Sequence, residues 1–243
     1  MQIKHLVFSI QNTVSMKTIG LIGGLSWQST LEYYRIINET MTERLGNGHA
    51  AKIIIDSLDF GEVDDFIHKK DFAGLSALIV NSAKRLEKAG AEILLIGANT
   101  MHFVAQDVID NIQIPLLHIV EATIEKIREK SLTGVALLGT RFTMEQDFYK
   151  QRLIDQGIEV FIPSVDDMDF IHNTIFTELF KAVRNPESKK RFLRIIDSLV
   201  KQGAQGVILG CTEIPMLIKQ EDCTVPVFDT TEIHALAAVE LAL

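Results

Sequence analysis

Short apolar runs and longer amphipathic stretches alternate along most of the chain. Runs this short and rich in Val, Ile and Leu are typical of strands buried on both faces, and the stretches between them have the spacing of helices. The alternation predicts an α/β fold whose mainly parallel sheets are covered by helices on both faces. The predicted strands are 18–22, 52–55, 92–96, 116–119, 134–138, 159–162, 206–209 and 225–228.

Local signals at the ends of the amphipathic stretches predict where helices begin. Capping boxes, in which Ser, Thr or Asp is followed three residues later by Glu or Gln, start at Ser29, Thr143 and Asp229. The Asn-Pro pair at Asn185 predicts another helix start. From there apolar residues recur at helical spacing, and Gly203 stands where a left-handed C-cap is expected.

Two parts of the chain resemble each other. KAGAEILLIGANT at 88–100 matches KQGAQGVILGCT at 201–212 without a gap, so that Gly97 faces Gly210. The block IGLIGG also resembles VALLGT, and IPLLH resembles VPVFD. Because the three pairs follow in the same order, they predict two similar α/β units in one chain.

The repeat also predicts where a ligand binds. Ligands of open α/β sheets bind at the carboxyl ends of the strands, and two facing units place these ends around one crevice. The expected site comprises residues 98–102 and 211–213, which carry small hydroxyl or amide side chains. Free N–H groups at helix N-termini favour a carboxylate or phosphate there. The expected ligand is a small molecule with an anionic group.

Composition excludes several functional classes. The chain has 243 residues, 47% hydrophobic and 23% charged, and a formal net charge of −8. Without clustered Lys and Arg we expect no nucleic-acid partner, and no run approaches the ~18 apolar residues that cross a bilayer. No metal-ligand spacing occurs, and GLIGG lacks the further Gly of a dinucleotide site, so neither metal nor nucleotide is expected.

The two cysteines indicate a cytoplasmic protein and a catalytic candidate. Cys211 and Cys223 do not form a disulfide framework, so a reducing cytosol is expected. Cys211 directly follows a predicted strand, at the expected N-terminal end of a helix, which lowers the pKa of a thiol. A role as a small buried apolar residue is the alternative. Cys223 lies in a polar stretch and is expected to be incidental.

Four motifs carry a resemblance to a known family: GLIGGLSWQST, GANTMH, LLGTRFTMEQDFY and GCTEI. They resemble the aspartate/glutamate racemase family of cofactor-independent amino-acid racemases, from Met16 to the end of the chain. The resemblance implies racemisation without pyridoxal phosphate, a homodimer, and two pseudosymmetric three-layer α/β/α units with the active site in the crevice between them. The predicted domains are 16–115 with 228–243, and 116–227, after a loose N-terminal extension over 1–15.

One position departs from the family's pattern. In the family's two-base scheme, one cysteine from each half flanks the substrate Cα. The resemblance places these cysteines at Cys211 and at Ala98, and the internal repeat pairs the same two positions. Because a methyl group transfers no proton, the symmetrical two-thiol scheme is not available.

Several alternatives follow from the missing thiol. His102, or a water held by Asn99 and Thr100, could supply the acid on the vacant face and give a slower or one-directional racemase. A decarboxylase or lyase with a single thiol is the second alternative, and ligand binding without turnover is the third. An engineered substitution at Ala98 is a further explanation.

Other candidates surround these loops. The resemblance implies that Asn99, Thr100 and Thr212 hold the substrate carboxylate, with helix capping as the alternative. Thr140 is expected to act similarly. Glu213 is expected to orient a His or the substrate ammonium, with a structural role as an acid in the first turn of a helix as the alternative. We also expect Ser26 and Trp27 to form a wall of the pocket, with a packing role as the alternative for Trp27.

The resemblance further implies an acidic substrate, whose second carboxylate is costly to bury without a cation. Arg141 and Lys181 are the nearest candidates by position. His118 and His234 are expected to be structural histidines with satisfied ring nitrogens.

Overall fold

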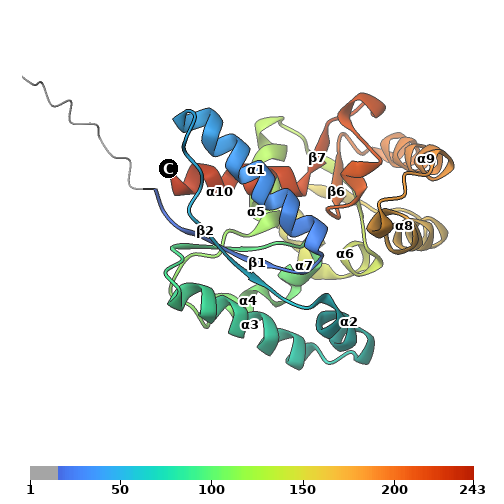
Figure 1. Ribbon diagram of the computed structural model, residues 1–243. Coiled ribbons are helices and arrows are strands. Elements are labelled where there is room, and N and C mark those ends of the chain that lie inside the picture. The colour runs from blue at the N-terminus through green and yellow to red at the C-terminus, as the bar shows by residue number, and fades with distance from the viewer. Residues whose placement is uncertain (1–15) are drawn as a thin grey trace, which may run out of the picture.

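The computed structural model describes residues 16–243, so the extension predicted for residues 1–15 lies outside the described residues. Two sheets form the centre of the molecule (Figure 1). The first contains β2 (Ile53–Ser57), β1 (Ile19–Gly23) and β3 (Ile93–Ile96), in that order. The second contains β5 (Glu159–Phe161), β4 (Gly134–Gly139), β6 (Val207–Gly210) and β7 (Val227–Asp229), in that order. All neighbouring strands pair in parallel, which confirms the predicted α/β class.

Each sheet is covered by helices on both faces. In the first unit, α1 (Trp27–Leu45) and α10 (Thr230–Ala242) pack on one face of β1 and β3. The opposite face packs against α2 (Phe60–Lys69), α3 (Phe72–Lys88) and the region of α4 (Ala105–Ile109). Figure 1 shows α1 beside α10, with α3 and α4 on the other side of β1.

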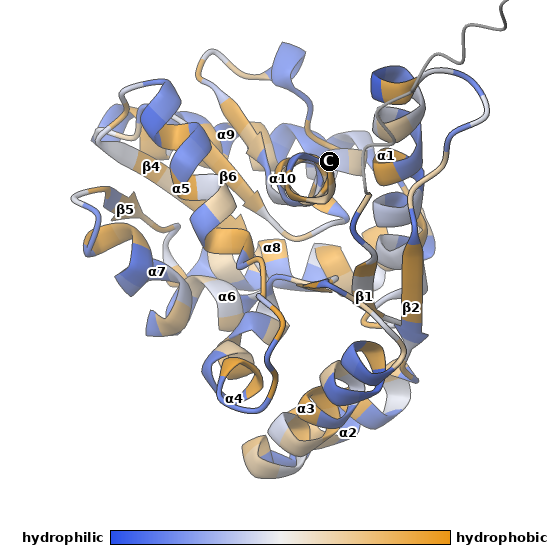
Figure 2. Cartoon of the chain, turned by 90° about the vertical axis from the view of Figure 1, so that its left-hand side faces the viewer, coloured by the Kyte–Doolittle hydropathy of each residue, from blue (hydrophilic) through white to orange (hydrophobic). Residues whose placement is uncertain are grey.

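The second sheet has the same three layers. Its one face packs on α5 (Ile119–Glu129) and α7 (Asp147–Ile154). The other face packs on α6 (Arg141–Glu145), α8 (Val165–Thr177) and α9 (Pro186–Gln202). Figure 2 shows β2 and β6 largely in the hydrophobic colour, whereas α1 mixes both colours. Burial on both faces explains why β1, β3, β4 and β6 are apolar without alternation, whereas the edge strand β2 is only partly buried.

Short 3-10 helices complete the chain: η1 (Thr100–Val104), η2 (Leu179–Lys181), η3 (Ile214–Met216) and η4 (Gln220–Asp222). The two sheets fit two units, and the domain boundaries at 115/116 and 227/228 stay a prediction. No helix within residues 16–243 has the length and apolar character needed to cross a membrane.

The glycines paired by the repeat have the same structural role. Gly97 follows β3 and lies beside β1, and Gly210 ends β6 and lies beside β4. A Cβ at Gly97 would lie 3.0 Å from the Ile22 carbonyl oxygen, and a Cβ at Gly210 would lie 3.0 Å from that of Leu138. Backbones approach this closely only where a side chain is absent. The repeated Gly therefore marks the point where the chain leaves each of the two sheets.

The segment 116–119 was predicted to be a strand and is not one. Only an isolated bridge pairs Leu116 with Leu94, and α5 begins at Ile119 with His118 as its N-cap. The His118 ring accepts from the backbone N–H of Val120, which ends the extended segment after one bridge.

Two of the four predicted helix starts are wrong. Ser26, not Ser29, caps α1, and its hydroxyl accepts from the Ser29 N–H. Thr140, not Thr143, caps α6 in the same way. In both cases an earlier hydroxyl in the strand-to-helix loop caps the helix first: Thr140 directly follows β4, and Ser26 lies three residues after β1.

The other two starts and the helix end are confirmed. Asp229 caps α10 by accepting from the N–H groups of the second and third helical residues. Asn185 caps α9, which ends at Gly203 with a φ of 127°.

Candidate active site

A cavity of about 350 Å³ lies at the carboxyl ends of the strands of both sheets. The loop after β1 contributes Ser26, and the loop after β3 contributes residues 98–101. From the second sheet come Thr140 after β4 and residues 210–213 at the end of β6. The structure thus brings together Ala98, Asn99, Thr100, Cys211, Thr212 and Glu213, which the repeat and the resemblance had singled out.

Trp27 is the exception among the predicted site residues. It is the first residue of α1, its side chain is 68% exposed, and it does not line the cavity. Ser26 caps the helix immediately before it, so the chain turns there and directs the next side chain towards solvent. The expectation that Trp27 forms a wall of the pocket is therefore not met by this structure.

Cys211 forms the centre of a buried cluster. Its thiol donates to Glu213 Oε2 over 3.0 Å, and the Thr212 hydroxyl donates to the same oxygen over 2.6 Å. The other oxygen, Oε1, accepts from the Ser26 hydroxyl over 2.9 Å. Cys211 is 8% exposed and Glu213 is 3% exposed. A buried carboxylate that accepts three hydrogen bonds is held in one position, and the bond from Ser26 joins the two units.

The expected lowering of the Cys211 pKa is wrong. Burial raises the pKa of this thiol well above its usual value, and the charge of Glu213 raises it further. The helix that follows is only η3, a single short turn, whose dipole cannot offset these effects. At neutral pH the Cys211 sulfur therefore carries its proton, and Glu213 is the adjacent acceptor for it.

Ala98 occupies the corresponding place after β3, with a hydrogen-bonded carbonyl behind it. The His102 Nδ1–H donates to the Ala98 carbonyl over 2.9 Å, and His102 Nε2 accepts from the Ile119 N–H over 3.2 Å. His102 is buried and does not line the cavity. Because the backbone engages both ring nitrogens, this arrangement contradicts the alternative in which His102 acts as the acid on the vacant face.

Two further histidines pack against His102. The ring centroid of His118 lies 4.6 Å from that of His102, and the centroid of His234 lies 5.8 Å from it. His234 Nε2–H donates to the Leu117 carbonyl and Nδ1 accepts from the Tyr33 hydroxyl, so this ring is satisfied as predicted.

The prediction for His118 is wrong at one nitrogen, because its buried Nε2 has no partner among the described residues. Burial is the main cause that lowers the pKa of His118 to about 3 and of His234 to about 4. The pKa of His102 also falls well below its usual value for the same reason. Three neutral rings therefore lie behind Ala98, two from the first unit and His118 from the segment that begins the second.

Amide and hydroxyl groups line the cavity between the two loops. Asn99 Nδ2 donates to Thr230 Oγ1, and its buried Oδ1 has no partner within residues 16–243. The hydroxyl of Thr100 lies 3.3 Å from that of Thr140, across the two units. Asn99 forms no side-chain cap on η1, whereas Thr140 caps α6 and lines the cavity as well. These groups can bind the carboxylate and ammonium of an amino acid.

The remaining wall is apolar and was missed from the sequence. Phe60 and Ile67 come from α2, Phe142 from α6, Phe176 from α8 and Phe180 from η2. The Phe180 ring centroid lies 4.9 Å from that of Phe176 and 6.0 Å from that of Phe60, which belongs to the other unit. Only Phe142 falls within one of the quoted motifs, LLGTRFTMEQDFY, and nothing there marks it as a cavity residue. An aromatic residue in an amphipathic helix has the same pattern whether it faces core or cavity.

Comparison with known proteins agrees with this architecture. A family model described as Asp/Glu/Hydantoin racemase matches residues 22–238. The chain belongs to this family. The resemblance stated from the four motifs is thereby confirmed.

Members with known structures cover almost the whole chain. A candidate Asp/Glu racemase from Yersinia pestis is 45% identical with a TM-score of 0.89, and covers 93% of this chain and 99% of its own. An aspartate racemase homologue from Pyrococcus horikoshii OT3 is 39% identical with a TM-score of 0.84 and the same coverage. The broad specificity amino-acid racemase RacX of Bacillus subtilis (strain 168) is 25% identical over 176 residues, which are 71% of this chain and 74% of RacX.

Proposed function

We propose that this member of the family is a cofactor-independent amino-acid racemase that exchanges the α-proton of its substrate through Cys211. The observation that carries the proposal is the buried pair of Cys211 and Glu213, 3.0 Å apart, in the wall of the cavity between the sheets. Family membership supports proton transfer at an amino-acid Cα as the reaction. Asn99, Thr100 and Thr140 supply polar groups for the substrate head group in this scheme.

The first half of the reaction uses the dyad. Glu213 takes the thiol proton, and the Cys211 thiolate removes the proton from Cα, whose electron pair moves into the substrate carboxylate. Hydroxyl donors beside that carboxylate, such as Thr100 and Thr140, stabilise the charge as it develops. The buried, largely apolar site strengthens these interactions because it excludes water.

The second half is asymmetric because Ala98 has no proton to give. In this scheme a water on the Ala98 face donates the proton to Cα, and the resulting hydroxide takes the proton that Glu213 holds. Reprotonation by the Cys211 thiol on its own face returns the original enantiomer. We therefore expect exchange of the α-proton to be faster than inversion.

Proton NMR in deuterium oxide tests the proposal. L- and D-amino acids are incubated with the parent protein, Cys211→Ser and Ala98→Cys, while the Cα signal and the enantiomer ratio are followed. Cα exchange that is lost in Cys211→Ser supports the one-thiol base. Consumption of a substrate with release of carbon dioxide and no exchange would instead favour the single-thiol decarboxylase, which the lack of a second thiol at Ala98 keeps as the second candidate.

Three further expectations accompany this proposal. The homodimer and the cytoplasmic location stay predictions, as does the absence of a metal or other cofactor. Light scattering coupled to gel filtration measures the oligomeric state, and activity after dialysis against a chelator tests the metal.

A further inference from the structure

The strand-end loops and the helices contribute different chemistry to the cavity. The loops carry Cys211, Glu213 and the groups around Asn99, which suit the head group and Cα of an amino acid. The helices supply the apolar wall described above, and α2 and α8 also bring Asp64, His68 and His172 to the lining. A substrate whose Cα lies at the thiol therefore directs its side chain towards aromatic and aliphatic groups.

No Lys or Arg of residues 16–243 lines this cavity. Arg141, a candidate from the sequence, forms ion pairs with Glu145 and Asp169. Lys181, the other candidate, is exposed and does not line the cavity.

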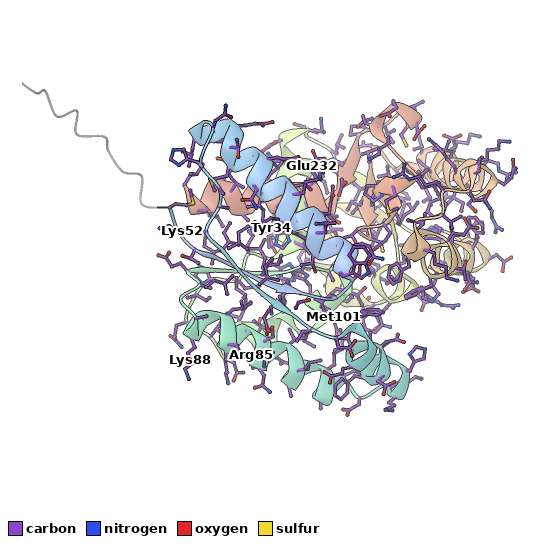
Figure 3. All side chains as sticks on the ribbon, viewed as in Figure 1. Tyr34, Lys52, Arg85, Lys88, Met101 and Glu232 are labelled. Atoms are coloured by element: carbon purple, nitrogen blue, oxygen red, sulfur yellow. The ribbon has the colours of Figure 1, made fainter. Side chains whose placement is uncertain are left out.

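Cations of the first unit lie elsewhere. Figure 3 shows Lys52, Arg85 and Lys88 on the side of the first unit away from Met101, which does line the cavity. Arg85 is paired with Asp56. None of these side chains compensates a negative charge inside the cavity.

The charges that do face the cavity are negative or balanced. Asp64 and Glu213 are both lining residues. His68 Nδ1 lies 3.2 Å from Asp64 Oδ1, so this ring is already engaged by an acidic side chain. Burial and then the charge of Arg141 lower the pKa of His172, which keeps this ring neutral. A second substrate carboxylate here would lose its hydration without gaining a cation.

We propose that the substrates of this site are amino acids with large uncharged side chains, such as leucine, methionine or phenylalanine, rather than aspartate or glutamate. This inference rests on the proposed racemase function and concerns only the substrate side chain. Burial of such a side chain against the apolar wall lowers the free energy of binding, because apolar surface is removed from water. The volume of the cavity is within the range of small-molecule sites.

A panel of amino acids tests the inference. Cα deuterium uptake is measured for leucine, methionine, phenylalanine, aspartate, glutamate, asparagine and glutamine. We expect kcat/KM for the large apolar group to exceed that for aspartate and glutamate by about tenfold or more. Asparagine and glutamine match the acidic pair in size without the charge, so they should exceed it too. Equal or faster exchange of aspartate or glutamate would overturn the inference and leave the racemase function intact.

A charge placed in the apolar wall should change the preference for the substrate side chain. Ile67→Arg puts a cation beside the aromatic wall, and the ratio of kcat/KM for leucine to that for aspartate should fall by about tenfold or more. The control is Ile154→Arg, because Ile154 is 50% exposed on α7 and lies outside the cavity. Circular dichroism checks that the variant is folded. An unchanged ratio in folded Ile67→Arg would contradict the assignment of the apolar wall to the substrate side chain.

Calorimetric binding separates failure of the inference from failure of the function. If no amino acid exchanges, binding of phenylalanine about tenfold tighter than aspartate supports the side-chain preference and contradicts the racemase. If none of the panel either exchanges or binds, both the preference and the proposed function are wrong.

Discussion

The loops after β3 and β6 leave their sheets in the same way and differ in chemistry. Each begins at a glycine packed closely against the neighbouring strand, and the residue after that glycine lines the cavity. In the second unit that next residue is Cys211, with Glu213 as its acceptor. In the first it is Ala98, and the register of the repeat places Thr100 opposite Glu213. The first loop therefore lacks both the thiol and the carboxylate, which teaches that equivalent folds need not keep equivalent chemistry.

The largest expected effect is loss of the thiol that lines the cavity. Cys211→Ser removes the group that exchanges the α-proton, and the rate of Cα deuterium uptake should fall by about a thousandfold. Cys223→Ser is the matched control, because Cys223 is also a free thiol and does not line the cavity. Equal losses in both variants would remove the distinction between the two loops.

The second effect concerns the carboxylate that only the second loop carries. Glu213→Gln removes the acceptor of the thiol proton, so exchange should slow by about a hundredfold. Because the charge of Glu213 raises the Cys211 pKa, its removal should lower that pKa. Ultraviolet titration of the thiolate measures this change. A thiol pKa that stays the same or rises would show that the two groups are not coupled.

A third variant makes the two loops more alike. Ala98→Cys places a thiol on the vacant face, and the ratio of inversion to exchange should rise by about tenfold, because a thiol transfers a proton to Cα more readily than water does. Enantiomer analysis beside the NMR exchange assay gives this ratio. Ala98→Ser has similar size without an effective acid and is the control. An unchanged ratio in Ala98→Cys would mean that another group already supplies the proton.

The smallest effect is on stability and arises from the histidines behind the first loop. His118 and His234 have folded pKa values of about 3 and about 4, below the unfolded value near 6.5. Protons therefore bind preferentially to the unfolded chain, and the free energy of unfolding should fall as pH drops from about 6.5 to about 4. Asp229, with its pKa raised to about 6, acts in the opposite direction over part of this range. Urea unfolding of the parent and His234→Gln at several pH values measures the slope, which should be shallower in the variant.

Much of the fold was predictable because its signals are local. Burial on both faces makes strand segments apolar, and seven of the eight predicted strands appear in the structure. The eighth, 116–119, pairs only at Leu116, because the His118 ring caps α5 almost at once. Helix starts were less predictable, since Ser26 and Thr140 compete with later hydroxyls in the same segments.

The candidate site was predictable in position and only partly in chemistry. The repeat and the motifs identified Ala98 and Cys211, and both line one cavity. The exposed side chain of Trp27 and the engaged nitrogens of His102 depend on which way each side chain points after folding. Neither orientation leaves a signal in the sequence.

The sequence by itself determined the α/β class, the two similar units and the unequal pair of loops, because periodicity, strand-end glycines and residue identity are written along the chain. Only the tertiary structure decided the protonation of Cys211 and the apolar character of the cavity wall. Burial and Glu213 set the thiol pKa, and Ser26 holds that carboxylate from the other unit. Phe60 and Phe180 meet only when the two units pack together. Solvent exposure and contacts between distant segments exist only in the folded chain, and these are the quantities that decide acidity and specificity.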